Sequence, residues 1–174
     1  FQYLFFCKIA CNLNNFKLRQ ICVFSIKKIM RDKNNIALIG MMGSGKSTIG
    51  RLMAKKLNKK FIDIDRKIED LENKKIGQIF ELKGEDFFRN LEFKVSSEYL
   101  RNNNSIISLG GGAFLNHKLR KIIKQNSISF WLYWASDILI KRLKSNTHRP
   151  IIKEMNDSEI KKMILKRNKV YAKS

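Results

Sequence analysis

The 174-residue chain is short of several residue types that mark whole classes of proteins. Its three cysteines, Cys7, Cys11 and Cys22, all lie in the first 22 residues, so the chain is not a disulfide-built secreted domain. No second pair of ligands at zinc spacing accompanies them, and we interpret them as incidental, which suits a reducing cytoplasm. The single proline, Pro150, and the lack of low-complexity stretches give no sign of a linker between domains. No uncharged apolar run approaches the roughly 18 residues of a membrane-spanning helix.

Acidic residues are also scarce. The chain has 15 Asp and Glu against 36 Lys and Arg, which gives a net charge of +21. A charge of this size raises the question of nucleic-acid binding. The lysines, however, are scattered along the whole chain and do not gather on one motif with interleaved aromatic residues. We therefore interpret the charge as a solvated, lysine-rich surface, and expect no nucleic-acid partner and no membrane partner.

Residues 1–34 contain no glycine and a single acidic residue, Asp32, against seven lysines and arginines, and the chain opens on Phe1. We predict that residues 1–34 are a basic extension outside the enzyme fold, that Met30 is the true start, and that residues 1–29 are upstream sequence. An organelle transit peptide and a native helical extension remain alternatives, although the stretch lacks the arginine and serine richness of a transit peptide. Residues 35–174 are long enough for one domain.

The clearest motif in the chain is Gly40-x-x-x-x-Gly45-Lys46-Ser47, which satisfies the phosphate-loop pattern. The apolar run 36–39 before it predicts a buried strand, and apolar residues at helical spacing after it predict a helix. In this context the backbone N–H groups cradle phosphates, the lysine reaches the β- and γ-phosphates, and the serine hydroxyl lies on Mg²⁺. The residues expected to bind ATP here are Gly43, Ser44, Gly45, Lys46, Ser47 and Thr48.

Strand-like runs at 36–39, 61–64, 105–109 and 128–134 alternate with helical patterns. Such alternation predicts a parallel sheet covered by helices on both faces, which is a three-layer α/β/α fold. Ligands bind beyond the carboxyl ends of the strands in these sheets. We therefore expect the phosphate loop and the motifs that follow the second and third strands to meet at one rim.

Two motifs follow those strands. In "FIDID", Asp63 and Asp65 alternate with apolar residues, so we expect both carboxylates to project to one side of a strand, close to a cation. In "SLGGGAF", three consecutive glycines, Gly110–Gly112, are costly in backbone entropy and favour a place where a ligand touches the backbone; a loose turn is the alternative.

Arginines supply the remaining candidates. Arg89 follows the helix break expected at Gly84, and its planar fork suits a carboxylate. Taken alone, an arginine at this position is more often a surface residue paired with Glu85 or Glu92 on the helix. Arg142, Arg149 and Arg167 flank a charged segment around Pro150 that suits a lid closing over phosphates. We interpret His148 as a surface residue of that lid.

Taken in order, the motifs GMMGSGKSTIGRLMAKKL, FIDID, GQIFELKGEDFFRNLE, SLGGGA, HRPII and KRNKVY resemble shikimate kinase over roughly residues 34–172. The resemblance implies a P-loop NTPase-like fold of the nucleoside monophosphate kinase kind. It also implies transfer of the γ-phosphate of ATP to the 3-hydroxyl of shikimate, with Mg²⁺, on the route to chorismate and the aromatic amino acids.

The resemblance further assigns roles to residues. Those implied to bind shikimate are Arg89 and Arg167 at its carboxylate, Asp65 at its hydroxyls, the backbone of Gly111 and Gly112, and Phe80, Phe88 and Glu92 around the ring. Those implied at the nucleotide and metal are Ser47 and Asp63 for Mg²⁺, Arg149 over the phosphates and Arg142 beside the adenine. Lys46, Asp65 and Arg149 are the implied catalytic residues.

The family usually continues beyond the position of Ser174 with a last strand, an adenine-contacting loop and a helix, so we expect residues 1–174 to be a fragment. The lid is also about one residue shorter than in the family. Two other functions stay open: a kinase for another acceptor, such as gluconate or a nucleoside monophosphate, and a non-catalytic module that binds ATP or nucleic acid. We expect a cytoplasmic monomer.

Overall fold

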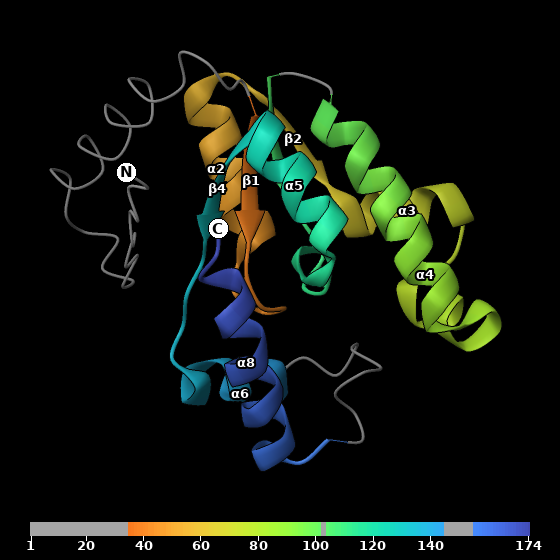
Figure 1. Ribbon diagram of the computed structural model, residues 1–174, viewed down its shortest axis with the longest axis vertical. Coiled ribbons are helices and arrows are strands. Elements are labelled where there is room, and N and C mark those ends of the chain that lie inside the picture. The colour runs from red at the N-terminus through yellow and green to blue at the C-terminus, as the bar shows by residue number, and fades with distance from the viewer. Residues whose placement is uncertain (1–34, 102–103, 145–154) are drawn as a thin grey trace, which may run out of the picture.

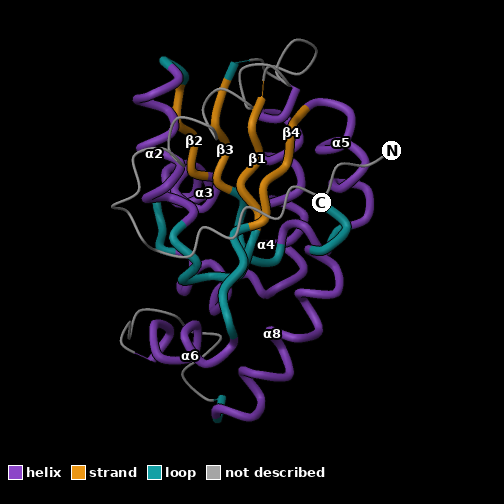
Figure 2. The backbone as a smooth tube through the Cα atoms, turned by 90° about the vertical axis from the view of Figure 1, so that its left-hand side faces the viewer, coloured by secondary structure: helices purple, strands orange, loops and turns teal. Residues whose placement is uncertain are grey.

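The computed structural model describes residues 35–101, 104–144 and 155–174. In this part of the chain four strands form one parallel sheet in the order β2-β3-β1-β4 (Figure 2). Their bounds are β1 Asn35–Ile39, β2 Lys60–Asp63, β3 Ser105–Ser108 and β4 Ser127–Trp131. The four strands predicted from sequence are confirmed, although the second and third each end one residue earlier than predicted and the fourth ends before position 134. The fourth strand ends at Trp131, which pairs with Ile39, the last residue of its partner β1.

Helices cover both faces of the sheet, as the α/β/α prediction requires (Figure 1). Successive residues of a strand point to opposite faces. In β1, Ile36 and Leu38 accordingly pack with Ala54 of α2, whereas Ala37 and Ile39 belong to the larger cluster that includes α4 and α5. Burial on both faces explains why β1 is a continuous apolar run.

The helices in the described ranges are α2 Lys46–Leu57, α3 Ile64–Glu72, α4 Ile76–Arg101, the short 3₁₀ turn η1 Ala113–Leu115, α5 His117–Asn126, α6 Ser136–Lys144 and α8 Asp157–Tyr171. The break predicted at Gly84 is confirmed, because α4 kinks there at φ 79° and ψ 170°. Helix α5 was not predicted, although Asn116 caps it by accepting from Lys118 N–H and Leu119 N–H. None of these helices combines the length and the apolar character needed to cross a bilayer.

The order of the strands in the sheet indicates where a ligand would bind. From β1 the chain crosses to β2 on the far side of β3, and it later returns to β4 on the other side of β1. The connections therefore diverge at the carboxyl ends of β1 and β3, which is where ligands bind in such sheets. The β1 arrow in Figure 1 points towards α6 and α8, so these two helices lie beyond the same end of the sheet.

Candidate active site

The phosphate loop, residues 40–47, leaves β1 and runs into the start of α2. Gly43 and Gly45 have φ of 78° and 87°, values that favour glycine, and Gly45 is the N-terminal cap of the helix. In the described part of the chain no side chain caps this helix, and its first turn has no acidic residue. The N–H groups at the start of α2 and the positive end of its dipole can therefore be offered to an anion.

Lys46 places its charge on the same loop. Its Nζ donates to the carbonyl oxygens of Gly40 and Met41, at 2.9 Å each, and the residue is 8% exposed. Within the loop Ser44 is fully buried, whereas Thr48 is exposed on the first turn of α2. The ammonium group is thus held where a phosphate chain over the loop would meet it.

Ser47 and Asp63 bring two oxygen ligands together, since the Ser47 hydroxyl donates to Asp63 Oδ2 at 2.5 Å. A hydroxyl and a carboxylate are hard oxygen donors of the kind Mg²⁺ takes, and Mg²⁺ usually draws its other ligands from water and substrate phosphates. The described residues contain no group of three or more His, Cys, Asp and Glu side chains suited to a metal. The pair therefore fits an ion shared with a bound triphosphate.

The prediction that Asp63 and Asp65 alternate along a strand is wrong. Strand β2 ends at Asp63, which caps α3 by accepting from Arg66 N–H at 3.4 Å, so Asp65 lies in the first turn of that helix. The alternating letters of "FIDID" indicate a strand, but a capping aspartate favours the start of a helix. Both carboxylates still line one cleft.

Asp65 and Glu92 converge above Gly110. A Cβ atom on Gly110 would lie 2.2 Å from Glu92 Oε1 and 2.8 Å from Asp65 Oδ1, so only glycine fits there. Glu92 is 3% exposed, and among the described residues its Oε1 has no hydrogen-bond partner. Burial raises the pKa of Glu92, Arg89 opposes that rise, and the nearby charge of Asp65 adds to it.

Arg89 spans the other side of the glycine turn, as we call Gly110–Gly112. Its Nη1 donates to Glu92 Oε2 at 2.8 Å and its Nε donates to Glu85 Oε1 at 3.1 Å. Burial alone would lower the pKa of Arg89, but the two carboxylates outweigh it and raise the pKa. The helix-surface pairing considered from sequence is therefore present, and the same guanidinium also lines the cleft.

Phe80 and Phe88 pack beside this arginine, with ring centroids 4.6 Å apart. The Arg89 guanidinium lies 5.2 Å from the Phe88 ring and 5.9 Å from the Phe80 ring. Arg167 reaches the cleft from α8, and its Nη1 lies 3.8 Å from Met41 Sδ at the phosphate loop.

One open cleft of about 1430 Å³ joins these parts. Its walls include Ser47, Asp63, Asp65, Phe80, Phe88, Arg89, Glu92, Gly111, Gly112 and Arg167. A smaller cavity of about 220 Å³ adjoins it around Arg89, Glu92 and Arg167. The cleft thus runs from the start of α2 to two arginines that could hold a carboxylate, with two carboxylates that could hold hydroxyl groups between them.

Arg142 lies apart from that cleft, on α6, with its guanidinium 3.8 Å from the centre of the Trp134 ring. The Trp134 indole N–H donates to the Ser44 carbonyl at 3.0 Å, which ties this pair to the phosphate loop. Sequence reasoning missed Trp134, because the bond joins residues 90 positions apart. His148, Arg149 and Pro150, all assigned to the lid, lie outside the described residues.

Comparison with known proteins gives this arrangement a family. Residues 42–174 match the family model for shikimate kinase. The chain is 42% identical over 140 residues to the shikimate kinase of Persephonella marina, covering 80% of this chain and 85% of that one. The chain belongs to the shikimate kinase family. It is also 36% identical over 160 residues to the shikimate kinase of Bartonella quintana, covering 90% of this chain and 76% of that protein.

Solved structures agree. A shikimate kinase from Acinetobacter baumannii in complex with shikimate superposes with a TM-score of 0.77 at 33% identity, covering 84% of this chain and 82% of that one. The shikimate kinase of Aquifex aeolicus gives 0.72 at 37% identity, covering 80% and 83%. The predicted family and the predicted P-loop kinase fold are thus confirmed, and the chain is an ATP-dependent kinase by family.

Proposed function

We propose that this shikimate kinase-family protein transfers the γ-phosphate of ATP to the 3-hydroxyl of shikimate, giving shikimate 3-phosphate and ADP. The observation that carries the proposal is the single cleft that joins Ser47 and Asp63 to Arg89 and Arg167. A small carboxylated polyol needs a cationic grip at its acid end and a carboxylate at its hydroxyl end. Arg89 with Arg167 would supply the cationic end, and Asp65 the carboxylate at the hydroxyl end, of one cleft.

Shikimate would lie with its carboxylate between Arg89 and Arg167 and its ring against Phe80 and Phe88. The backbone of Gly111 and Gly112 would face the ring. Asp65 would accept the proton of the attacking hydroxyl group. Fixing both ends of the acceptor selects which hydroxyl faces the γ-phosphate, and such orientation supplies a large share of the rate.

At the nucleotide end, the N–H groups of residues 43–48 and the ammonium of Lys46 would hold the phosphates. Ser47 and Asp63 would hold Mg²⁺, which when bound neutralises charge on the β- and γ-phosphates. Arg142 would lie beside the adenine. We propose Arg149 as the lid arginine over the transferring phosphoryl group, where a cation stabilises the spreading charge.

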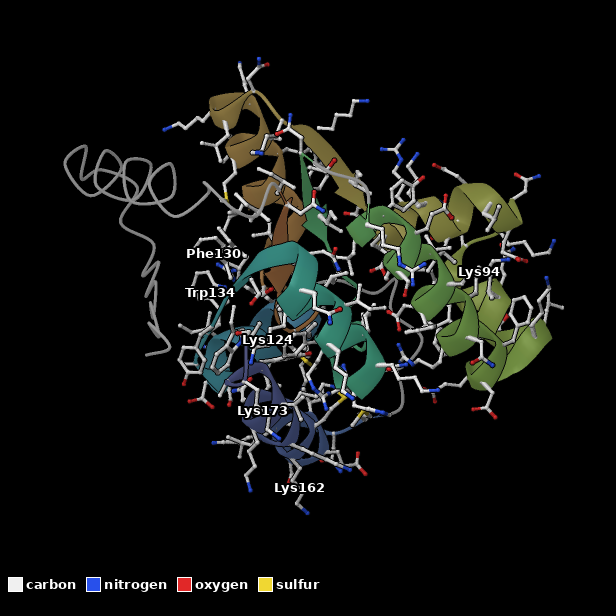
Figure 3. The ribbon with its side chains drawn as sticks, turned by 45° about the horizontal axis from the view of Figure 1, so that its top comes forward. Lys94, Lys124, Phe130, Trp134, Lys162 and Lys173 are labelled. Carbon is white, nitrogen blue, oxygen red and sulfur yellow. The ribbon has the colours of Figure 1, made fainter. Side chains whose placement is uncertain are left out.

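We further propose that residues 35–174 belong to the catalytic domain and that residues 1–34 lie outside it. We also propose that the protein works as a cytoplasmic monomer in chorismate biosynthesis, without a nucleic-acid or membrane partner. Exposed lysines on separate helices support a solvated positive surface: Lys94 on α4, Lys124 on α5, and Lys162 on α8 (Figure 3). A binding stripe would need such charges on one face with aromatic residues between them.

The test is a coupled assay of ADP release with shikimate, gluconate and nucleoside monophosphates as acceptors. Shikimate-dependent release is the expected result. Release with another acceptor would assign a different kinase activity, and no release with any acceptor would favour a non-catalytic nucleotide-binding module.

Arg89→Ala probes the acceptor end, and Arg101→Ala is its matched control on the exposed last turn of the same helix. Because Arg89 faces the acceptor and not the phosphate loop, its loss should raise the shikimate KM by about 100-fold and leave the ATP KM within about twofold. Equal loss of affinity for both substrates would contradict the assignment of Arg89 to the carboxylate.

A further inference from the structure

Tyr171, the last residue of α8, is fully buried beside the glycine turn. Its ring packs between Phe114, at 6.4 Å between ring centroids, and Trp131, at 6.1 Å. A tyrosine hydroxyl this deep needs a polar partner. It donates to the carbonyl oxygen of Gly111 and lies 4.0 Å from Met41 Sδ, so it sits where the glycine turn meets the phosphate loop.

The Gly111 carbonyl, which accepts from Tyr171, is the one carbonyl of the glycine turn for which the described residues show no backbone N–H donor within the turn. Within the turn, Ala113 N–H donates to Gly110 O at 3.1 Å, and Leu115 N–H donates to Gly112 O at 3.0 Å. The Gly111 carbonyl, between these two, accepts instead from a side chain 60 residues away in sequence. Burial raises the pKa of Tyr171, with Arg167 opposing, so the phenol stays a hydrogen-bond donor at neutral pH.

A displacement of this turn would move the acceptor relative to the phosphate loop. A Cβ atom on Gly111 would lie 3.1 Å from Met42 N, so the turn rests against the phosphate loop. On either side, Gly110 meets the carboxylate of Glu92 and Gly112 meets the guanidinium of Arg89 within 3 Å of where a Cβ would be. The position of Gly111 therefore sets the spacing between the nucleotide side and the acceptor side of the cleft.

We propose that Tyr171 is a positioning residue for phosphoryl transfer. Its hydroxyl fixes the Gly111 carbonyl and so holds the glycine turn, with the acceptor on it, in register with the phosphate loop. This inference rests on the proposed function. Arg167 lies four residues earlier on α8, so the last turn of one helix carries both an arginine for the acceptor and the residue that orders the backbone beneath it.

Tyr171→Phe is the sharpest variant, because it removes one oxygen atom and keeps the ring between Phe114 and Trp131. Tyr99→Phe is the matched control, since Tyr99 is a half-buried tyrosine near the end of α4 and does not line the cleft. For Tyr171→Phe we expect the shikimate KM to rise about tenfold, because the glycine turn on which the acceptor would rest loses a buried hydrogen bond. The ATP KM should stay within about twofold, because the phosphate loop keeps its own hydrogen bonds from Lys46 and from Ser44 N–H.

A second measurement needs no substrate. Hydrogen exchange of the backbone amides in residues 109–116, followed by mass spectrometry on the ligand-free protein, should be about tenfold faster in Tyr171→Phe than in the wild type. Tyr99→Phe should exchange and turn over like the wild type. This readout separates the two proposals. Absence of turnover with shikimate in the wild type would refute the proposed function, whereas the exchange rates would still test whether Tyr171 orders the backbone at Gly111.

Unchanged exchange over residues 109–116 in Tyr171→Phe would overturn the inference. A lower melting temperature with an unchanged shikimate KM would also overturn it, because that pattern marks Tyr171 as a packing residue only. Faster exchange with an unchanged KM would show that the order of the turn does not matter to the acceptor, and would overturn it equally.

Discussion

Replacing Gly112 by alanine perturbs Arg89 without touching Arg89 itself. Gly112 has φ −98° and ψ −19°, a conformation that alanine adopts without strain. The added Cβ atom would lie 2.3 Å from Arg89 Nη1 and 2.7 Å from its Cζ. The guanidinium must therefore withdraw by about 1 Å to reach an ordinary contact distance. That movement also strains the 2.8 Å bond from Nη1 to Glu92.

An error of about 1 Å in a positioning group costs on the order of 100-fold in rate. If Arg89 holds the acceptor carboxylate, Gly112→Ala should lower kcat/KM for shikimate by about 100-fold, chiefly through KM, and leave the ATP KM within about twofold. The coupled ADP-release assay, run at saturating concentration of each substrate in turn, measures both values.

Gly50→Ala should show the opposite pattern. Its Cβ would lie 2.3 Å from the Phe61 ring and 3.1 Å from Leu38, inside the core between α2 and the sheet. Overpacking of this kind costs about 1–3 kcal/mol and should lower the melting temperature by roughly 3–10 °C, with little change in the shikimate KM. The reasoning is refuted if Gly112→Ala melts as early as Gly50→Ala while its shikimate KM stays at the wild-type value.

Three further predictions concern charge and stacking. Lys46→Ala should lower turnover by on the order of 10³-fold, because a cation at the transferring phosphates is lost; retained ADP release would assign phosphate binding elsewhere. Trp134→Phe, which loses the donor to Ser44 and weakens the stack with Arg142, should raise the ATP KM about threefold and spare the shikimate KM; an unchanged ATP KM would remove this pair from the nucleotide site. Because burial raises the pKa of Glu92 above its ordinary 4.5, the folded state binds that proton more tightly than the unfolded chain, so this group's contribution to stability is lost as pH rises through the folded pKa. Glu92→Gln should flatten that decline in denaturant titrations across pH, and an identical slope in the two proteins would contradict the raised pKa.

The sequence predicted best those features that depend on the backbone conformation of neighbouring residues. The phosphate loop and the break at Gly84 depend on residues adjacent in the chain, and both were predicted. Asp65 was placed on a strand because "FIDID" alternates polar and apolar residues, whereas in the structure Asp63 caps α3 and Asp65 lies in its first turn.

Long-range contacts were out of reach from the sequence. Trp134 and Tyr171 contribute bonds to residues 90 and 60 positions away, and no local pattern predicts such pairs. For Tyr171, periodicity can report burial on a helix but says nothing of what the hydroxyl group contacts. Arg89 was predictable in part. The sequence indicated its helix, but not its contact with Gly112, which lies after a different strand.

The two oxygens of Asp63 have different partners, and this division links two halves of the protein. Oδ1 accepts from the backbone at the start of α3, and Oδ2 accepts from Ser47 at the start of α2. A single carboxylate therefore connects α3, which carries Asp65, to α2, which begins at Lys46. A metal ion bound at Oδ2 would therefore act on the same carboxylate that caps α3, two residues before Asp65.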